Sequence, residues 1–191
     1  MQKVQINNIS NLTNPKYINP VRINYTQNNK QKSWEAIESF NSVAVLLYHK
    51  EKDSFLLVKQ LRITTMLNND VEDGYTYELC AGIIDKDKSL EQITKEEILE
   101  ECGYDVPLEE IKRVTSYYTS VGFSGARQTM FFASIDESMR VGEGGGIDDE
   151  EIELFFLPLK EAKKFMFDEK YKKTPGLIMA FYWFFDTIQN G

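Results

Sequence analysis

The sequence predicts an α/β protein, built as an α/β/α sandwich around a mixed sheet and carrying a small antiparallel β appendage at its N-terminus. Two near-continuous apolar runs, SVAVLLYH at 42–49 and SFLLVKQLR at 54–62, have the composition of strands that are covered on both faces. A capped segment at 90–102 has helical periodicity, and two more helical segments close the chain. Strands of this kind, combined with helices on both faces, define the sandwich class.

Residues 1–38 form the appendage in this prediction, and residues 39–191 form the main domain. The first segment is rich in Asn and contains two short alternating runs, VRINYTQ at 21–27 and KQKSWEAI at 30–37. Such runs predict two or three antiparallel strands. A unit this small does not usually fold alone, so its apolar side chains are expected to pack on the main domain or on a second chain.

The main domain begins with the two central strands, which the turn-like KEKD at 50–53 joins. The helix at 90–102 has clear ends, because Ser89 and Gln92 form a capping-box pattern and Gly103 suits a left-handed stop. The other expected elements are strands at 75–82, 111–119, 126–134 and 151–159, and helices at 159–167 and 175–188.

Composition excludes several classes of function. A net charge of −8 argues against a nucleic-acid partner, which needs a positive surface. No segment approaches the ~20 apolar residues of a membrane span, and the polar start has no secretion signal, so we expect a cytoplasmic protein without a membrane partner. Cys80 and Cys102 are then expected to be free thiols. His49, the only histidine, is expected to be a surface turn residue, which leaves no histidine-based nucleophile system.

Three carboxylates on the capped helix are the strongest functional signal. Glu97, Glu100 and Glu101 stand at positions i, i+3 and i+4, which share one helical face. At roughly 100° per residue they fall in the same arc as the apolar Leu90 and Ile93, so they are expected to face inward. Mg²⁺ binds a few carboxylates together with substrate phosphate, and the segment therefore suits a metal site that handles phosphates.

This segment resembles the Nudix box, whose pattern is G-x5-E-x7-R-E-U-x-E-E-x-G-U with U apolar. The matching residues are Gly82, Glu97, Ile98, Glu100, Glu101, Gly103 and Tyr104. Lys88 replaces the first Glu of the pattern and Glu96 replaces its Arg. From about residue 34 to 183 the chain is similar to the UDP-sugar diphosphatase branch of the ADP-ribose pyrophosphatase-like Nudix enzymes, including the runs LLVKQLR, ELCAG and TSVGFSGARQTMFF.

The resemblance implies a metal site and a catalytic base. Glu97 and Glu101 are then the main Mg²⁺ ligands, with Glu100 assisting and the carbonyl of Ala81 adding a ligand; Mn²⁺ is a possible substitute. Glu97, Glu100 and Glu150 are the implied catalytic residues, with Glu150 as the general base on a mobile loop. In that loop Gly144, Gly145 and Gly146 suit a hinge, and Asp148, Asp149 and Glu151 remain alternatives for the base.

The resemblance also implies residues that bind the substrate. Arg62 resembles an arginine that reaches the phosphates, and Glu78 could orient it. Trp34 resembles an aromatic that stacks on the nucleobase across a homodimer interface, although a Trp in a small β unit is more often a packing residue. Arg127 and Gln128 are candidates for sugar or diphosphate contacts, with Phe123 and Ser124 as weaker ones.

The function implied is metal-dependent hydrolysis of a nucleoside diphosphate sugar, UDP-glucose-like, to nucleoside monophosphate and sugar phosphate. The alternatives are an ADP-ribose pyrophosphatase and a non-catalytic nucleotide-binding dimer, the latter suggested by the two departures from the box. Lys88 and Glu96 invert the charges of the family pair, so they either form a swapped ion pair or are independent surface residues.

Overall fold

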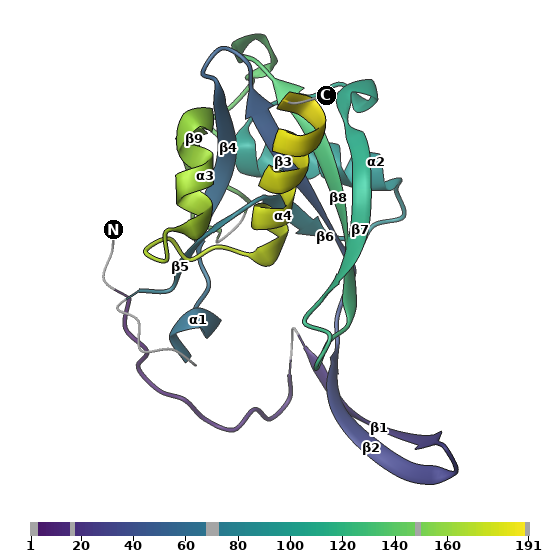
Figure 1. Cartoon of the computed structure of the whole chain (residues 1–191). Helices are drawn as coiled ribbons and strands as arrows, with labels where there is room; N and C mark the ends of the chain where they lie inside the picture. Colours follow the sequence, from purple (N-terminus) through teal and green to yellow (C-terminus); the bar gives the residue numbers. More distant parts are fainter. Residues whose placement is uncertain (1–3, 16–17, 68–72, 148–149, 190–191) are drawn as a thin grey trace.

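The computed structural model describes residues 4–15, 18–67, 73–147 and 150–189, and it has a mixed sheet with helices on both faces (Figure 1). The predicted α/β sandwich with an N-terminal β appendage is confirmed. The strands of the main sheet are β3 (Ser42–His49), β4 (Ser54–Leu61), β5 (Tyr75–Glu78), β6 (Cys80–Ile83), β7 (Lys112–Thr119), β8 (Ala126–Ile135) and β9 (Ile152–Pro158). The helices are α1 (Thr64–Leu67), α2 (Leu90–Glu97), α3 (Leu159–Phe167) and α4 (Pro175–Phe184), with short helical turns η1 (Ile98–Cys102), η2 (Leu108–Glu110), η3 (Glu137–Met139) and η4 (Phe185–Gln189).

The sheet order is β5-β4-β3-β8-β7, with β6 also paired to β3 and β9 also paired to β4. The β3–β8 pair is parallel, and the other pairs of this sheet are antiparallel. No helix in the described ranges is both long enough and apolar enough to cross a bilayer.

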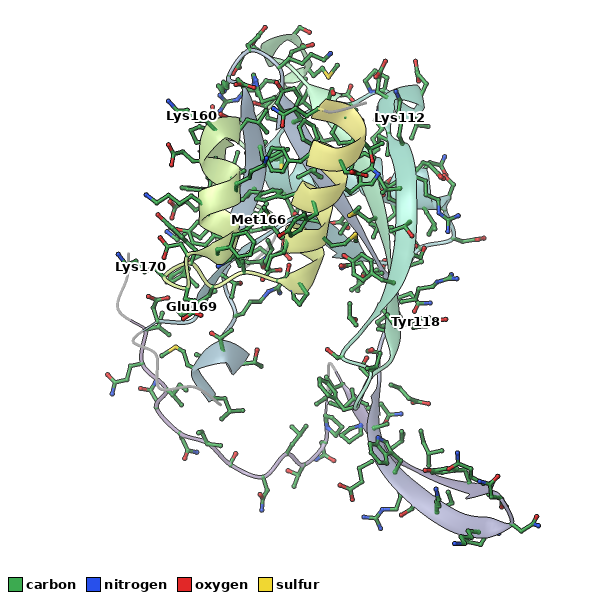
Figure 2. All side chains as sticks on the ribbon, in the orientation of Figure 1. Lys112, Tyr118, Lys160, Met166, Glu169 and Lys170 are labelled. Atoms are coloured by element: carbon green, nitrogen blue, oxygen red, sulfur yellow. The ribbon has the colours of Figure 1, made fainter. Side chains whose placement is uncertain are left out.

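Strands β3 and β4 are buried on both faces, as their apolar runs predicted. Alternate residues of β3 enter two separate clusters: Ala44 and Leu46 face α3 and α4, whereas Val45 and Leu47 face α2. In Figure 2, Met166 of α3 lies between that helix and the sheet, while Lys160 projects outward. Burial of both sheet faces holds α2, and the carboxylates that follow it, at a fixed height over β3.

The appendage is one hairpin, β1 (Asn19–Gln27) and β2 (Lys30–Glu38), which projects away from the body of the molecule (Figure 1). It meets the β7–β8 loop through a hydrogen bond of 2.7 Å from the Ile37 amide to the Phe123 carbonyl, and one of 2.8 Å from Trp34 Nε1 to the Gly122 carbonyl. Ser39 Oγ and Ser124 Oγ are 2.6 Å apart. Most of the hairpin's side chains are exposed in the single chain. The domain boundary at residue 38 stays a prediction.

The segment at 75–82, predicted as one strand, is divided at Leu79. Its first part, β5, pairs with β4, and its second part, β6, pairs with β3. The segment therefore changes partner where β3 and β4 diverge. This change brings β6 directly beneath the box helix, and α2 and η1 both contact β6.

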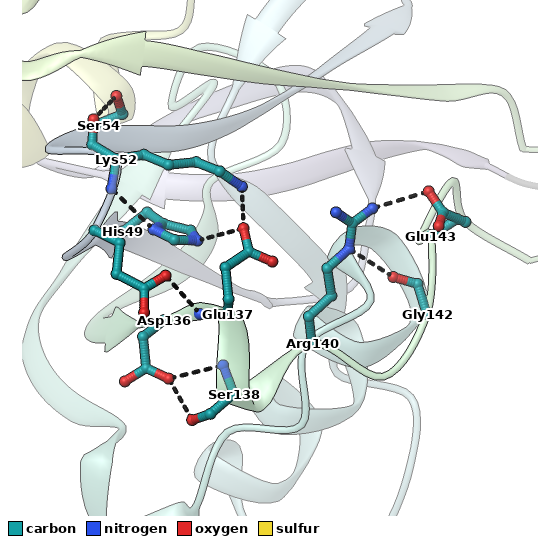
Figure 3. A network of polar contacts seen from close by, with 10 residues as sticks. His49, Lys52, Ser54, Asp136, Glu137, Ser138, Arg140, Gly142 and Glu143 are labelled. Atoms are coloured by element: carbon teal, nitrogen blue, oxygen red, sulfur yellow. Dashed lines mark hydrogen bonds and ion pairs between the residues drawn. The ribbon is translucent and has the colours of Figure 1, made fainter.

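His49 corrects the expectation of a surface turn residue, because the imidazole is completely buried. Its Nδ1 accepts a hydrogen bond of 3.3 Å from the Lys52 amide (Figure 3). The ring packs edge-on against Tyr104 and Phe156. The Tyr104 hydroxyl, also buried, has no hydrogen-bond partner among the described residues. The β3–β4 turn folds back over the imidazole. The position of His49 at the end of a strand did not predict this burial.

Candidate active site

The box helix begins as predicted. Ser89 Oγ accepts from the Gln92 amide, and the Gln92 side chain accepts from the Ser89 amide, so both halves of the capping box are present. The last turn is a π-helical turn, η1, and it ends at Gly103 with φ of 77°. A π turn widens the helix locally and is frequent at functional sites. Here the turn contains Glu100 and Glu101.

Glu97 and Glu101 point inward, to β6. Glu101 is 4% exposed, and its Oε2 accepts a hydrogen bond of 3.0 Å from the Ala81 amide. Glu97 lies so close to Gly82 that a Cβ atom there would be 2.0 Å from its carboxyl group. Glycine at this position is therefore a steric requirement for the approach of Glu97 to the strand.

Burial and mutual repulsion perturb both carboxyl groups. Burial raises the pKa of Glu101 to about 8, the hydrogen bonds from Cys80 and Ala81 oppose this, and the charge of Glu97 adds to it. Burial also raises the pKa of Glu97 to about 7, together with the charge of Glu100, while Lys86 acts in the opposite direction. Buried acids without a buried counter-charge suit a divalent cation, because a cation would relieve the repulsion between them. The predicted ligand set fits a metal ion in this respect.

The Gly-rich loop is docked against the box helix. The amides of Gly145 and Gly146 donate to the carbonyls of Glu101 and Glu100, at 2.9 and 3.1 Å. Gly144 has φ of 68°, and a Cβ atom there would lie 2.4 Å from the Glu101 carbonyl oxygen. The glycines therefore permit close backbone contact with η1, the turn that contains Glu100 and Glu101. The sequence predicted these glycines only as a hinge.

Glu150, the predicted base, is anchored at the end of this loop. Its Oε2 accepts a hydrogen bond of 3.2 Å from the Ile147 amide. Its charge contributes to the raised pKa values of Glu97 and Glu101, which places the three carboxylates within electrostatic reach of one another. Glu151 is exposed, and the alternatives Asp148 and Asp149 lie outside the described residues.

Arg62 and Glu78 form a bidentate pair. The guanidinium Nε and Nη2 atoms donate to the two carboxylate oxygens of Glu78, each at 2.9 Å, and the Thr76 hydroxyl donates to the same carboxylate. The hydrogen bond to Glu78 raises the pKa of Arg62, and the charges of Glu101 and Glu150 raise it further. About half of the Arg62 side chain stays exposed, so the guanidinium is oriented yet accessible.

The remaining predicted residues do not lie together. Gln128 faces α4 and lines a cavity of about 650 Å³ on the sheet face opposite α2. Arg127 is exposed on the other face of β8, because successive residues of a strand alternate. Trp34 is 55% exposed on the projecting hairpin. Two residues were not among those predicted: Lys86, whose charge lowers the pKa of Glu97, and Tyr117, which lines the same cavity as Gln128.

Lys88 and Glu96, the two departures from the box, are joined by an ion pair between Lys88 Nζ and Glu96 Oε1. Lys86 Nζ lies 3.2 Å from the other carboxylate oxygen of Glu96. The inverted pair is therefore present as a contact, with a second lysine that the sequence pattern did not indicate.

Among the described residues, His49, Glu51 and Glu137 have ligand atoms within 4.8 Å of one another, which is the distance range of a metal site. The hydrogen-bond pattern does not suit a metal, however. His49 Nδ1 accepts from the Lys52 amide, so Nε2 carries the proton in the neutral ring, and it faces Glu137 Oε1 at 3.3 Å. The Lys52 ammonium also binds Glu137 (Figure 3). Glu137 is therefore already paired with a protein cation, and its carboxylate is engaged without a metal ion.

Comparison with known proteins identifies the family. The NUDIX domain model matches residues 39–176, and the chain belongs to the Nudix family of hydrolases. It is 36% identical to the uridine diphosphate glucose pyrophosphatase NUDT14 of Bos taurus, over 92% of this chain and 91% of that protein. The protein of the same name from Mus musculus is 34% identical over 90% of each chain. GDP-mannose pyrophosphatase of Cronobacter sakazakii is 41% identical over 67% of this chain and 65% of its own length.

Proposed function

We propose that the protein hydrolyses the diphosphate bond of a nucleoside diphosphate sugar, giving a nucleoside monophosphate and a sugar phosphate. The observation that carries this proposal is the convergence of Glu97, Glu101, Glu150 and Arg62 within electrostatic reach of one another. The carboxylates suit a divalent metal ion, and the guanidinium suits the diphosphate that the ion accompanies. The names of the relatives, which refer to UDP-glucose and GDP-mannose, point to the same class.

Glu97, Glu100 and Glu101, with the Ala81 carbonyl, would hold the divalent cation, which we propose to be Mg²⁺ with Mn²⁺ as a substitute. When bound, the ion neutralises charge that develops on the diphosphate oxygens. Divalent metal is a general requirement of Nudix hydrolases. Identification of the ion as Mg²⁺ rests on the all-oxygen character of the ligand set.

Glu150 accepts a proton from the attacking water, whose oxygen forms the new bond to phosphorus. The bond between that phosphorus and the bridging oxygen breaks, and the bridging oxygen leaves with the other phosphate. Arg62 binds non-bridging phosphate oxygens, and Glu78 keeps the guanidinium in the orientation for doing so. Arg127 is exposed on the sheet face that carries the carboxylates and is a further candidate for a diphosphate contact.

The test is phosphate release in an assay coupled to a phosphatase, since the monoester products are phosphatase substrates and the intact diphosphates are not. We expect turnover of UDP-glucose with Mg²⁺ and none with EDTA. Parallel measurements of kcat/KM for ADP-ribose and GDP-mannose show which nucleobase and which sugar the enzyme prefers. A higher kcat/KM for ADP-ribose would identify an ADP-ribose pyrophosphatase. Absence of turnover on all three substrates, with binding retained, would identify a non-catalytic nucleotide-binding protein and refute the proposal.

We propose that the protein is a homodimer whose hairpins contribute to the interface, with Trp34 placed to stack on a nucleobase. Support comes from the exposed apolar side chains of the hairpin, since Ile23 and Trp34 are 48% and 55% exposed. In the adjoining loop Val121 and Phe123 are 75% and 53% exposed. Apolar groups gathered on a projecting element favour burial against another chain.

Removal of residues 1–38 tests the dimer and the domain boundary together. We expect a monomeric or poorly soluble product with weakened nucleotide affinity, measured by light scattering and calorimetry on both forms. An active, soluble, truncated monomer would contradict the proposal. The cytoplasmic location also stays a prediction, which fractionation of cells that express the native gene would test.

A further inference from the structure

Lys86 lies on the loop that joins β6 to α2, next to the metal-ligand carboxylates. Gly82 of β6 lies against the carboxyl group of Glu97, and the loop leaves the strand just after this contact. A hydrogen bond of 3.0 Å from the Lys88 amide to the Lys86 carbonyl forms a turn in the loop. The loop therefore begins at the carboxylates and turns back to the helix that bears them.

Glu96 binds two lysines of this loop through its two carboxylate oxygens. Lys88 Nζ pairs with Oε1, and Lys86 Nζ lies 3.2 Å from Oε2. The Nudix box has an arginine at the position of Glu96, and a cation there would repel the Lys86 ammonium. The departure from the box thus creates an anchor for a lysine at a position that the pattern leaves open.

The Lys86 ammonium also lies within electrostatic reach of the metal ligands. The hydrogen bond to Glu96 raises the pKa of Lys86, and the charges of Glu100 and Glu97 raise it further. Burial and the charge of Glu100 raise the pKa of Glu97, and the charge of Lys86 opposes them. Lys86, and not Lys88, is the lysine among the main charges that act on Glu97. The Lys86 side chain is 42% exposed, so its ammonium remains accessible to a ligand.

Arg62 reaches the same group of carboxylates from a different side. The carboxylates of the site that act on Arg62 are Glu101 and Glu150, whereas the ligands that act on Lys86 are the other two. The carboxylates therefore lie between two cations. A diphosphate bound at the carboxylates with its metal ion carries negative charge on several oxygens, and a cation on each side can pair with it.

We propose that Lys86 is a substrate-binding residue that holds the diphosphate on a different side from Arg62. The inference rests on the proposed function, and it concerns binding of the substrate and not of the metal. A phosphate oxygen offers the ammonium a charge-assisted hydrogen bond in place of its exposed contact with Glu96. The flexible four-carbon stem of lysine allows this exchange without movement of the backbone. Glu96 keeps its ion pair with Lys88 throughout.

The experiment compares Lys86→Met with Lys88→Met, which are matched because each removes one ammonium and one ion pair of Glu96. The two side chains are similarly exposed, at 42% and 43%. At saturating Mg²⁺ we expect Lys86→Met to raise KM for UDP-glucose about five- to thirtyfold and to leave kcat within about threefold, because the lost contact is made before and during the reaction. Lys88→Met is expected to keep KM within about twofold of wild type, since an exposed ion pair contributes little.

Two further measurements separate substrate binding from a structural role. Lys86→Arg keeps a cation that binds phosphate, so KM is expected to stay within about threefold of wild type. Calorimetric Mg²⁺ affinity in the absence of substrate is expected to be unchanged or tighter in Lys86→Met, because a cation beside the ligands repels a metal ion.

An unchanged KM in Lys86→Met, or an equal rise in both methionine variants, would overturn the inference. Weaker Mg²⁺ affinity in Lys86→Met would also overturn it, because Lys86 would then organise the metal ligands. Failure of the proposed function is distinguishable, because wild type would then hydrolyse no substrate. In that case calorimetric dissociation constants of UDP-glucose with Mg²⁺ decide: weaker binding by Lys86→Met alone supports the inference, and equal affinities overturn it.

Discussion

Glu101→Gln separates the metal-binding role of this residue from its effect on folding. The side chain is 4% exposed, and burial beside Glu97 raises its pKa to about 8. Glutamine has nearly the same shape, and its amide oxygen can still accept the hydrogen bond from the Ala81 amide. The substitution removes a negative charge from a site that contains several.

The expected gain in metal-free stability follows from the two pKa values. A glutamate with an ordinary pKa of 4.5 in the unfolded chain and about 8 in the folded protein disfavours folding above pH 4.5. The cost rises through this range and is complete above pH 8. At 1.36 kcal/mol per pH unit it reaches at most about 5 kcal/mol. Coupling to Glu97 and local relaxation reduce this, so we expect Glu101→Gln to be more stable by about 1–3 kcal/mol at pH 8 in EDTA.

Thermal unfolding in EDTA measures this gain. For a chain of this length the increase in Tm is roughly 2–12 °C at pH 8, and it shrinks as the pH falls to 5.5. Added Mg²⁺ is expected to raise the Tm of the wild type and to raise that of the variant less, since ligand binding to the folded state stabilises it. Glu109→Gln, on the exposed turn after the box, is the control and is expected to behave as wild type.

The kinetic prediction is loss of nearly all turnover of UDP-glucose. Two results would refute the reasoning. A rate above about a tenth of wild type, a loss below ~1.4 kcal/mol of barrier, would remove Glu101 from the ligand set. The second refuting result is a metal-free Glu101→Gln variant that is less stable than wild type at pH 8. The Glu101 carboxylate would then stabilise the folded protein, contrary to the unfavourable burial and repulsion argued above.

Glu150→Gln is expected to lower kcat by 10² to 10⁴ with little change in Mg²⁺ affinity, and Glu151→Gln is expected to have little effect; the opposite order in a kinetic comparison would move the base by one residue. Gly82→Ala places a methyl group on the Glu97 carboxyl, so weaker Mg²⁺ binding and a lower kcat are expected, and unchanged calorimetric affinity would argue against Glu97 as a ligand. For the inverted pair, Lys88→Glu and Glu96→Arg are each expected to lower the Tm, with partial recovery in the double variant, whereas additive changes in the double-mutant cycle would mean that the contact has no energetic role.

The local sequence determined those strands and helices that have a clear hydrophobic pattern or a capping motif at their ends. Residues 43–47 are buried on both faces because every one of them is apolar, and that property does not depend on the partner strand. The start of α2 follows from Ser89 and Gln92, which satisfy amides within the same turn. The inward orientation of Glu97 and Glu101 also followed from helical spacing, because a helix fixes which residues share a face.

Contacts between distant segments decided the strand pairing and the position of the loops. Neither feature leaves a hydrophobic periodicity in the local sequence from which it could be predicted. Leu79 divides one apolar run between two partner strands. The cover over His49 comes from a turn and from Tyr104, which is far away in the chain. Local sequence indicates which residues carry the charge and which helices and strands present them. The tertiary structure decided the burial of Glu101 and the docking of the Gly-rich loop, because both depend on atoms that only folding brings together.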